Sequence, residues 1–335
     1  MGCHSPLKGW RNWDTGGIQF RRDGSGEKME VGCGQCLGCR LDYSRMWAMR
    51  IVHESCLWEH IGGNCFITLT YRDAKDCSLE QLEERKFVPD DWSLHKEHVQ
   101  KFIKRLRKFF PDQKVRYFYA GEYGKKCKHG IDLELVGCPL CNVGRPHYHM
   151  CLFNASFPDL EAYESDYGIE RLTSKSLERL WGYGFVDVGE LNFASASYTA
   201  RYILKKIGGV KKPDHYMSCD VNGEITFISP EYVAMSRGNS SRKGEKCGIG
   251  ADWFRKYKSD VFPSDEVPVP GYGVMNGVPR YYDEMLRDED PKMYEEVKRC
   301  RNVYLKHHSD ELTEGRLLAK HKVKKARLKE KERML

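Results

Sequence analysis

Between residues 64 and 207, strand-like and helix-like segments follow one another in an order that few folds allow. Four segments rich in β-branched and aromatic residues predict strands: 64–71, 115–120, 147–153 and 185–188. Three segments with apolar residues at helical spacing predict helices: 93–110, 174–180 and 194–207. The order β-α-β-β-α-β-α matches a ferredoxin-like antiparallel sheet built from split βαβ units, with one further helix. We therefore expect an α+β fold with helices flanking the sheet.

The rest of the chain differs from this central part in composition. We expect four segments: a Cys-rich N-terminal segment with a helix (1–60), a central domain (61–210) with a Cys-rich insertion (124–144), an irregular C-terminal extension (211–300) and a basic helical tail (301–335). The tail holds eleven Lys and Arg against five acids, whereas the whole chain has a net charge of +7. Such a tail favours a polyanionic partner, although a simply solvated helix has the same composition.

The sequence also limits where the protein acts. No stretch approaches the ~18 apolar residues of a membrane helix, so we expect no membrane partner. The N-terminus lacks the apolar region of a secretory signal, which predicts a cytoplasmic protein. In that compartment the fourteen cysteines indicate metal ligands or reduced thiols rather than disulfides.

The sharpest chemical signal is the histidine pair, His147 and His149, at the start of the third predicted strand. Side chains alternate along a strand, so both imidazoles point to the same face, where they can hold a metal ion. Glu122, at the end of the preceding strand, lies beside the pair if the two strands are antiparallel neighbours. Two imidazoles and a carboxylate leave coordination positions open for a substrate. This ligand set suits Mg²⁺ or Mn²⁺ in a phosphodiester site, and Zn²⁺ and Fe²⁺ also accept it.

The last predicted helix carries Tyr198, Tyr202 and Lys205. Spacings of four and three residues place the three side chains on one helix face. A free tyrosine has a pKa near ~10, so it attacks poorly at neutral pH unless a cation or a metal-polarised phosphate assists it. The three residues can form a nucleophile set. Taken alone, they also fit an amphipathic helix with tyrosines at the edge of the core.

Two clusters match the ligand types of zinc sites. The first, in the insertion, consists of Cys127, His129, Cys138 and Cys141. The second, in the N-terminal segment, consists of Cys33, Cys36 and Cys39, with Cys3 as a candidate fourth ligand. Sulfur and imidazole donors in this number suit tetrahedral Zn²⁺. One zinc in each cluster, one zinc shared between them, and reduced thiols without metal are all compatible with the sequence.

A basic face of the first predicted helix is a candidate DNA contact. It consists of Lys101, Lys104, Arg105, Arg107 and Lys108. Such groups neutralise phosphates, and aromatic side chains near a cleft can stack on unpaired bases. Simple solvation of a charged helix face is the alternative.

Several strings of this sequence occur in an order that marks a known group of enzymes. They are CGQCLGCRLDYSRMWAMR (33–50), CFITLTYRD (65–73), KFIKRLRK (101–108), YFYAGEYG (117–124), RPHYHMCLF (145–153), LWGYGFVDVGELNFASASYTARYILKK (180–206) and PEYVAMSRGNSSRKGEKCGIGADWF (230–254). On these strings the chain resembles the HUH endonucleases of rolling-circle replication. Within that superfamily it resembles the replication-initiation proteins of gokushovirus-type microviruses.

The resemblance implies a metal-dependent, two-tyrosine enzyme that nicks and joins DNA. The histidine pair and Glu122 would hold the divalent metal. Tyr198 or Tyr202 would attack the scissile phosphate and become joined to the 5′-phosphate, leaving a 3′-OH as primer. Lys205 matches the lysine that follows the tyrosines. The Cys-rich insertion between Glu122 and the histidine pair is a departure from the family pattern.

The implied function is initiation of rolling-circle replication of a small single-stranded DNA phage in the cytoplasm of its bacterial host. The implied partners are single-stranded origin DNA, the double-stranded replicative form, and a host helicase and polymerase, because the sequence has no Gly-rich Lys-Ser/Thr loop of a helicase. Two alternatives fit the same residues. One is a plasmid mobilisation or transposition nuclease of the HUH type. The other is a zinc-bearing nucleic-acid-binding protein without catalysis.

Overall fold

The computed structural model of the chain describes residues 2–12, 17–20, 26, 28–164, 168, 170–201, 212–219, 224–238 and 245–333. The chain divides into two compact units, a terminal unit made of Met1–Met46 with Asp283–Leu335 and a central unit made of Trp47–Tyr282. The four-segment division expected from the sequence stays a prediction. Of the helices in the described ranges, none is long and apolar enough to cross a membrane.

The central unit is built on a seven-stranded sheet in the order β12-β5-β6-β4-β9-β8-β7, with antiparallel neighbours throughout. Its strands are β4 (Asn64–Thr70), β5 (Arg116–Tyr123), β6 (Pro146–Phe153), β7 (Leu160–Glu164), β8 (Glu170–Ser174), β9 (Val186–Gly189) and β12 (Tyr232–Met235). The prediction of an α+β fold with an antiparallel sheet is therefore confirmed.

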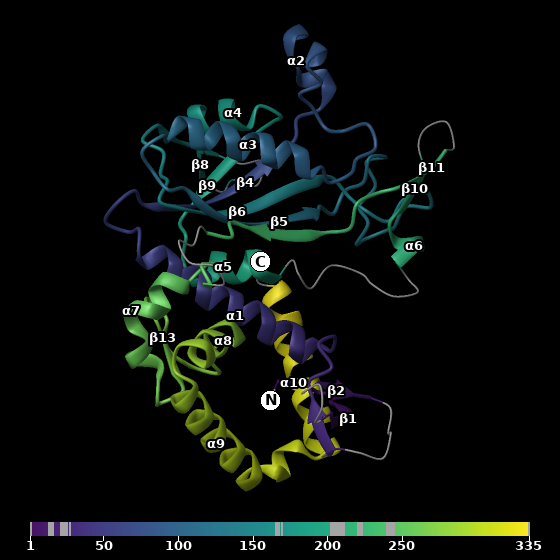
Figure 1. Cartoon of the computed structure of the whole chain (residues 1–335). Helices are drawn as coiled ribbons and strands as arrows, with labels where there is room; N and C mark the ends of the chain where they lie inside the picture. Colours follow the sequence, from purple (N-terminus) through teal and green to yellow (C-terminus); the bar gives the residue numbers. More distant parts are fainter. Residues whose placement is uncertain are drawn as a thin grey trace. The chain divides into compact units, whose positions relative to one another are not determined.

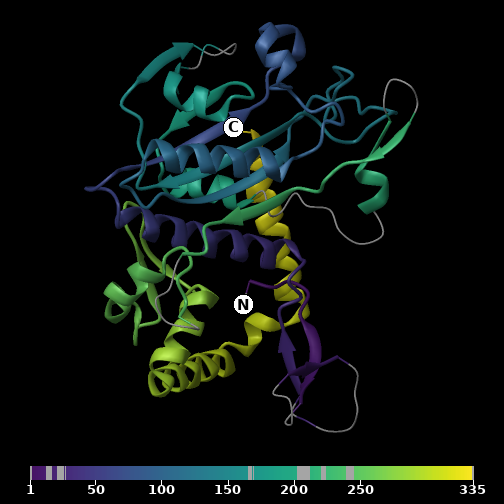
Figure 2. The same ribbon diagram turned by 45° about the horizontal axis from the view of Figure 1, so that its top comes forward.

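Two crossover connections give the sheet its split βαβ order. Strands β4 and β5 are joined through α3 (Lys96–Phe109) and lie on either side of β6. Strands β6 and β9 are joined through a connection that contains α4 (Lys175–Trp181) and lie on either side of β4. Figure 1 shows α3 and α4 on one face of the sheet and α5 (Phe193–Arg201) on the other, and Figure 2 shows α3 lying over the strands from a second direction.

Alternation along the central strands separates an apolar face from a face with polar side chains. On β4, Ile67 and Leu69 are fully buried and belong to the core that α3 and α4 cover. Phe102 of α3 and Trp181 of α4 fill this core, where each fully buried side chain contributes about 1.5–3 kcal/mol. The intervening residues of β4, such as Thr68, point to the opposite face, where α5 lies.

Local signals explain where α4 begins and ends. The hydroxyl of Ser174 accepts a hydrogen bond from the backbone N–H of Leu177 at 3.1 Å and so caps the first turn. Gly182 follows the helix with φ of +75°, a left-handed conformation that a glycine adopts without strain.

Two parts of the structure differ from the expectation. The hairpin of β7 and β8 was not predicted, because its residues are mostly exposed and lack an apolar alternation. Residues 211–300 are not an irregular extension. They contain α6 (Lys212–His215), β10 (Met217–Cys219), β11 (Ile225–Phe227), β12, α7 (Ala251–Val261), β13 (Glu266–Val269), β14 (Gly273–Asn276), α8 (Arg280–Glu289) and the start of α9 (Pro291–His307). These elements are short, and prolines and glycines between them hide the periodicity.

Between β4 and α3, the central unit also contains η1 (Ala74–Asp76) and α2 (Leu79–Glu83).

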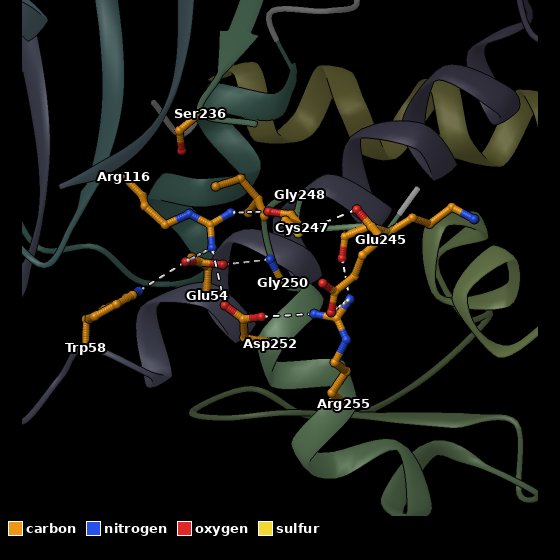
Figure 3. Close-up of polar contacts among 12 residues, drawn as sticks. Glu54, Trp58, Arg116, Ser236, Glu245, Cys247, Gly248, Gly250, Asp252 and Arg255 are labelled. Atoms are coloured by element: carbon orange, nitrogen blue, oxygen red, sulfur yellow. Dashed lines mark hydrogen bonds and ion pairs between the residues drawn. The ribbon is translucent and has the colours of Figure 1, made fainter. Parts of the chain in front are cut away.

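A buried ion pair supports the sheet from its α5 side (Figure 3). Arg116 at the start of β5 contacts Glu54 with an Nη1–Oε1 distance of 2.9 Å, and both side chains are buried. The indole N–H of Trp58 and the backbone N–H of Gly250 donate to the two carboxylate oxygens of Glu54. Arg116 also donates to the carbonyl oxygen of Cys247. These hydrogen bonds compensate the loss of water around the two charges.

The terminal unit contains a small sheet and the C-terminal helices. The sheet has the order β2-β1-β3, with β1 (Leu7–Arg11), β2 (Ile18–Gln19) and β3 (Lys28–Val31). Helix α1 (Leu37–Cys56) begins in this unit. The chain ends in α9, η4 (Ser309–Leu312) and α10 (Glu314–Arg333). The expected helical character of the basic tail is thus present in α9 and α10.

Candidate active site

The register of β5 and β6 brings the predicted metal ligands together. Glu122 pairs directly with His147, and His149 lies two residues further along the same face. Oε1 of Glu122 lies 2.6 Å from Nε2 of His147 and 3.0 Å from Nε2 of His149. Glu122 and His149 are buried, whereas His147 is partly exposed. The three side chains each offer one ligand atom within 4.8 Å of the others.

The contacts of His147 show that this site fits a cation. Its Nδ1 lies 3.2 Å from the carbonyl oxygen of Arg145, and its Nε2 lies 2.6 Å from Oε1 of Glu122. Both oxygens only accept hydrogen bonds, whereas a neutral imidazole has a single N–H, so one ring nitrogen directs a lone pair at an oxygen. A proton or a metal ion between these two atoms removes the repulsion. Two nitrogen donors and one carboxylate can hold a divalent ion such as Mn²⁺ or Mg²⁺.

Two residues of β4 that the sequence analysis did not single out contact His149. The hydroxyl of Thr68 lies 3.0 Å from Nδ1 of His149, in the register that pairs these two residues across the strands. Such a contact orients the imidazole so that its Nε2 faces Glu122, where it could also serve as a metal ligand. The ring of Phe66 stacks on the imidazole with centroids 5.7 Å apart. Alternation in 64–71 places both residues on one face, but only the strand order shows that this face meets the histidine pair.

Tyr198 lies beside this site. Helix α5 packs on β5 and β6, and its Ala196 and Ala200 are fully buried against them, which allows a close approach. The ring of Tyr198 meets the imidazole of His149 edge-on, with centroids 5.0 Å apart. About a third of Tyr198 is exposed, at 36%. The other two members of the predicted nucleophile set, Tyr202 and Lys205, lie outside the described residues.

A groove of about 500 Å³ opens next to Tyr198 and His149. Phe66 and Thr68 form one part of its lining, and residues of β8 and β9 form another. In the latter part, Arg171 and Asp187 form an ion pair at 2.9 Å. Tyr198 and His149 both line this groove, so the phenol and one of the predicted metal ligands are open to it.

The four cysteines of the N-terminal cluster come together in the terminal unit. Cys3, Cys33, Cys36 and Cys39 each offer a sulfur within 4.8 Å of the other three. The Sγ–Sγ distances from Cys3 are 3.7 Å to Cys33 and 3.8 Å to Cys36. Ligands about 2.3 Å from a tetrahedral zinc lie about 3.8 Å apart, so this cluster can bind Zn²⁺.

The charge state of Cys36 suits this role. Burial raises its pKa, but the backbone N–H groups of His4 and Cys39 donate to the sulfur and outweigh burial, so the pKa falls to about 6. Metal ligands of this kind bind as thiolates.

The insertion forms the second predicted cluster. Nδ1 of His129 lies 3.4 Å from Sγ of Cys138, 3.4 Å from Sγ of Cys141 and 3.9 Å from Sγ of Cys127. All four ligand atoms lie within 4.8 Å of one another, so this cluster can also bind Zn²⁺. Each cluster is complete by itself. The clusters lie in different units, and each has the four ligands that one Zn²⁺ needs.

The predicted basic face of α3 lies apart from the candidate active site. Helix α3 covers the face of the sheet opposite α5 and Tyr198 (Figure 1). Arg105 donates from Nε to the carbonyl of Leu180 at 2.6 Å and from Nη2 to that of Trp181 at 2.7 Å, so it stabilises the C-terminus of α4. The other four residues are exposed: Lys101, Lys104, Arg107 and Lys108. Their contact with DNA stays a prediction.

Comparisons with known proteins place this arrangement in a family. The profile of the family described as Replication-associated protein ORF2/G2P matches residues 64–207, which contain the whole candidate active site. Replication-associated protein ORF2 of Spiroplasma virus 4 is 34% identical over 265 residues, which are 77% of this chain and 68% of the relative.

Two further relatives come from other phages. Replication-associated protein VP4 of Bdellovibrio phage phiMH2K is 28% identical over 300 residues, 88% of this chain and 80% of the relative. Replication-associated protein ORF4 of Chlamydia phage 1 is 28% identical over 202 residues, 57% of this chain and 41% of the relative. No solved structure matches the chain. The chain therefore belongs to the replication-associated protein ORF2/G2P family of microviruses, which are small single-stranded DNA phages.

Proposed function

We propose that this protein starts rolling-circle replication by cutting one DNA strand at the phage origin, as an HUH-type endonuclease with tyrosine nucleophiles. The observation that carries the proposal is the position of Tyr198, on the same sheet face as Glu122 and the histidine pair and 5.0 Å between centroids from His149. A protein that only binds nucleic acid needs no phenol beside a metal site. The groove at Tyr198 supports access of a DNA strand.

The chemistry follows from the residues of the site. A divalent ion bound by Glu122 and the histidine pair would supply Lewis-acid polarisation of the scissile phosphate. Tyr198 attacks the phosphorus with its phenolic oxygen, and the phenol loses its proton. The bond from phosphorus to O3′ breaks, and O3′ takes up a proton. The products are a 5′-phosphotyrosine and a free 3′-OH, which serves a host polymerase as primer.

The exchange conserves one phosphodiester-type bond, so the strand can later be rejoined without ATP. Tyr202 is proposed as the second nucleophile, which releases the strand held by Tyr198 and allows nicking and joining to alternate. Lys205 is proposed to stabilise the phenolate by its charge. We propose Mg²⁺ or Mn²⁺ for the active site and structural Zn²⁺ for the two cysteine clusters. A host helicase is proposed to unwind the double-stranded replicative form in the bacterial cytoplasm.

A covalent-adduct experiment tests this function. The protein is incubated with a single-stranded origin oligonucleotide and Mn²⁺, and the tryptic digest is analysed by mass spectrometry. Trypsin cleaves after Arg201, so Tyr198 and Tyr202 fall on the separate peptides 180–201 and 202–205. We expect a 5′-phosphate-linked nucleotide on one or both tyrosines, and none in the presence of a chelator. Binding of the oligonucleotide without any adduct would favour the non-catalytic alternative.

A further inference from the structure

The C-terminal helix α10 carries a strong positive charge that the proposed nicking chemistry does not use. Of its residues from Glu314 to Leu328, six are basic: Arg316, Lys320, Lys322, Lys324, Lys325 and Arg327. Glu314 is the single acid of this stretch. An α-helix rises about 1.5 Å per residue, so these charges are distributed at fixed intervals along its axis.

One side of α10 is held within the terminal unit. Leu317 is buried, and Nδ1 of His321 lies 3.1 Å from Nδ1 of His4. Arg316 and Lys320 both form ion pairs with Glu311 of η4. These contacts occupy two of the six basic residues and fix the orientation of the helix.

The contact at His4 connects α10 to the N-terminal cysteine cluster. The backbone N–H of His4 donates to Sγ of Cys36 at 3.3 Å, while the imidazole of the same residue meets His321. His4 therefore links the N-terminal cysteine cluster to α10. The helix is a supported element rather than a loose tail.

Three further basic residues of α10 present uncompensated charge to solvent. Lys322, Lys325 and Arg327 are exposed, and no described acid pairs with any of the three. Positive side chains without intramolecular partners favour binding to a polyanion. When they contact its phosphates, the counterions bound to the polyanion are released. A membrane-surface helix needs a continuous apolar stripe, whereas the exposed apolar residues of α10, Leu318 and Val323, lie five positions apart.

The composition of α10 also distinguishes between two forms of nucleic acid. Proteins that hold single strands combine basic groups with aromatic side chains on which bases stack. The stretch from Glu314 to Leu328 contains no Phe, Tyr or Trp. Duplex DNA offers the denser row of phosphates and needs no stacking platform.

We propose that α10 is a sequence-independent contact for double-stranded DNA, in which Lys322, Lys325 and Arg327 neutralise phosphates. The choice of DNA as the polyanion rests on the proposed function, which this contact deepens. The helix would hold the protein on the replicative form while the active site acts on an exposed strand.

The test compares two charge-reversed variants of the full-length protein. The test variant carries Lys322→Glu, Lys325→Glu and Arg327→Glu. The matched control carries Lys292→Glu, Arg299→Glu and Lys306→Glu on exposed positions of α9, which gives the same change of net charge within the same unit. Binding is measured by fluorescence anisotropy on a short duplex of arbitrary sequence, on its separated strand, and on phosphatidylserine vesicles, between about 50 and 200 mM salt.

We expect the test variant to lose more than about tenfold in duplex affinity and to show a salt slope smaller by about 3, because three phosphate contacts are removed. The control should change much less, and both variants should still form the tyrosine adduct on single-stranded origin DNA. Adduct formation is scored separately, so loss of nicking would count against the proposed function and not against this contact. An unchanged duplex affinity, an equal loss in the control or on the single strand, or a loss confined to vesicles would overturn the proposal.

Discussion

The phenol ring of Tyr198 stands edge-on to the imidazole of His149, with an angle of 77° between the rings and 5.0 Å between their centroids. Phe66 stacks on the same imidazole and also meets the ring of Tyr198 edge-on, with centroids 6.3 Å apart, so the three rings contact one another. This contact connects the proposed nucleophile on α5 with the proposed metal ligands on the sheet. A change at any of these residues is therefore expected to affect the nicking reaction directly.

Removing the phenolic oxygens tests the nucleophiles. We expect Tyr198→Phe and Tyr202→Phe each to keep partial nicking, because either remaining phenol can attack, while the double variant loses nicking. Phenylalanine retains the ring, so its packing on His149 is preserved. Nicked product and covalent adduct are quantified on denaturing gels. The exposed Tyr304, changed to Phe, is the matched control, and full activity in the double variant would assign the nucleophile to another residue.

Removing the imidazoles tests the metal site. The variant with His147→Ala and His149→Ala should lose metal-dependent cleavage by at least about 100-fold, since polarisation of the phosphate contributes several kcal/mol. It should still bind the origin oligonucleotide, because the basic residues are unchanged. Cleavage is measured against Mn²⁺ concentration, with the exposed His60→Ala as control. Unchanged cleavage would remove Glu122 and the histidine pair from the reaction.

Thr68 is expected to act as a positioning residue through its contact with Nδ1 of His149. Thr68→Val keeps the shape of the side chain but removes the hydroxyl, so the imidazole loses an orienting partner. We expect the Mn²⁺ concentration needed for half-maximal nicking to rise by about 10- to 100-fold, with a smaller change at saturating metal. Thr68→Ser should restore the metal requirement. A defect that saturating Mn²⁺ leaves unchanged would indicate a general packing effect instead.

How much of this site the sequence predicts depends on how far apart along the chain the interacting residues lie. Alternation alone predicts that His147 and His149 share a face. The pairing of Glu122 with His147 also depends on the register of β5 and β6. A tight hairpin turn would fix this register, but the strands are separated by the insertion, so the sequence alone does not predict it. The contact of Thr68 depends on β4 lying next to β6, which is a property of the crossover.

The same reasoning applies to the parts of the fold that were not predicted. Strand β7 has five exposed residues, so no apolar face marks it, and its position is defined by backbone pairing with β8. Strand β12 has four half-buried residues and extends the sheet beside β5 from a distant part of the chain. Cys3 was a candidate ligand from the sequence, but only folding brings it next to Cys33.

The geometry of the two cysteine clusters predicts how much zinc the protein contains. We expect one zinc ion per cluster in the purified protein, measured by mass spectrometry of metals. Cys39→Ser should lose the ion of the terminal unit, and Cys138→Ser should lose the ion of the insertion. Each loss should lower the melting temperature, because metal binding contributes to folding free energy. Cys300→Ser, at an exposed cysteine outside both clusters, should keep both ions. An unchanged zinc content in either cluster variant would contradict the assignment.

His53 is expected to make the stability of the central unit depend on pH. It is fully buried, its ring stacks on Trp253 with centroids 3.4 Å apart, and its Nε2 donates to the carbonyl of Pro268 at 2.9 Å. Nδ1 can then accept from the hydroxyl of Tyr282 at 2.8 Å, so the neutral ring is satisfied on both sides. Burial lowers the pKa of His53 to about 3, against a smaller opposing effect of the hydrogen bond to Pro268.

In the unfolded chain this histidine titrates near pH 6.5, so between about pH 6.5 and pH 3 the unfolded state binds more protons than the folded state. The free energy of unfolding should therefore fall as the pH decreases through this window, by up to about 1.4 kcal/mol per pH unit from this residue. Urea unfolding at several pH values measures the slope. His53→Gln should be less stable at neutral pH but have a flatter slope, whereas His60→Gln, at an exposed histidine, should keep the slope of the natural chain. Equal slopes in all three proteins would mean that His53 is protonated in the folded state or titrates there as freely as in the unfolded chain.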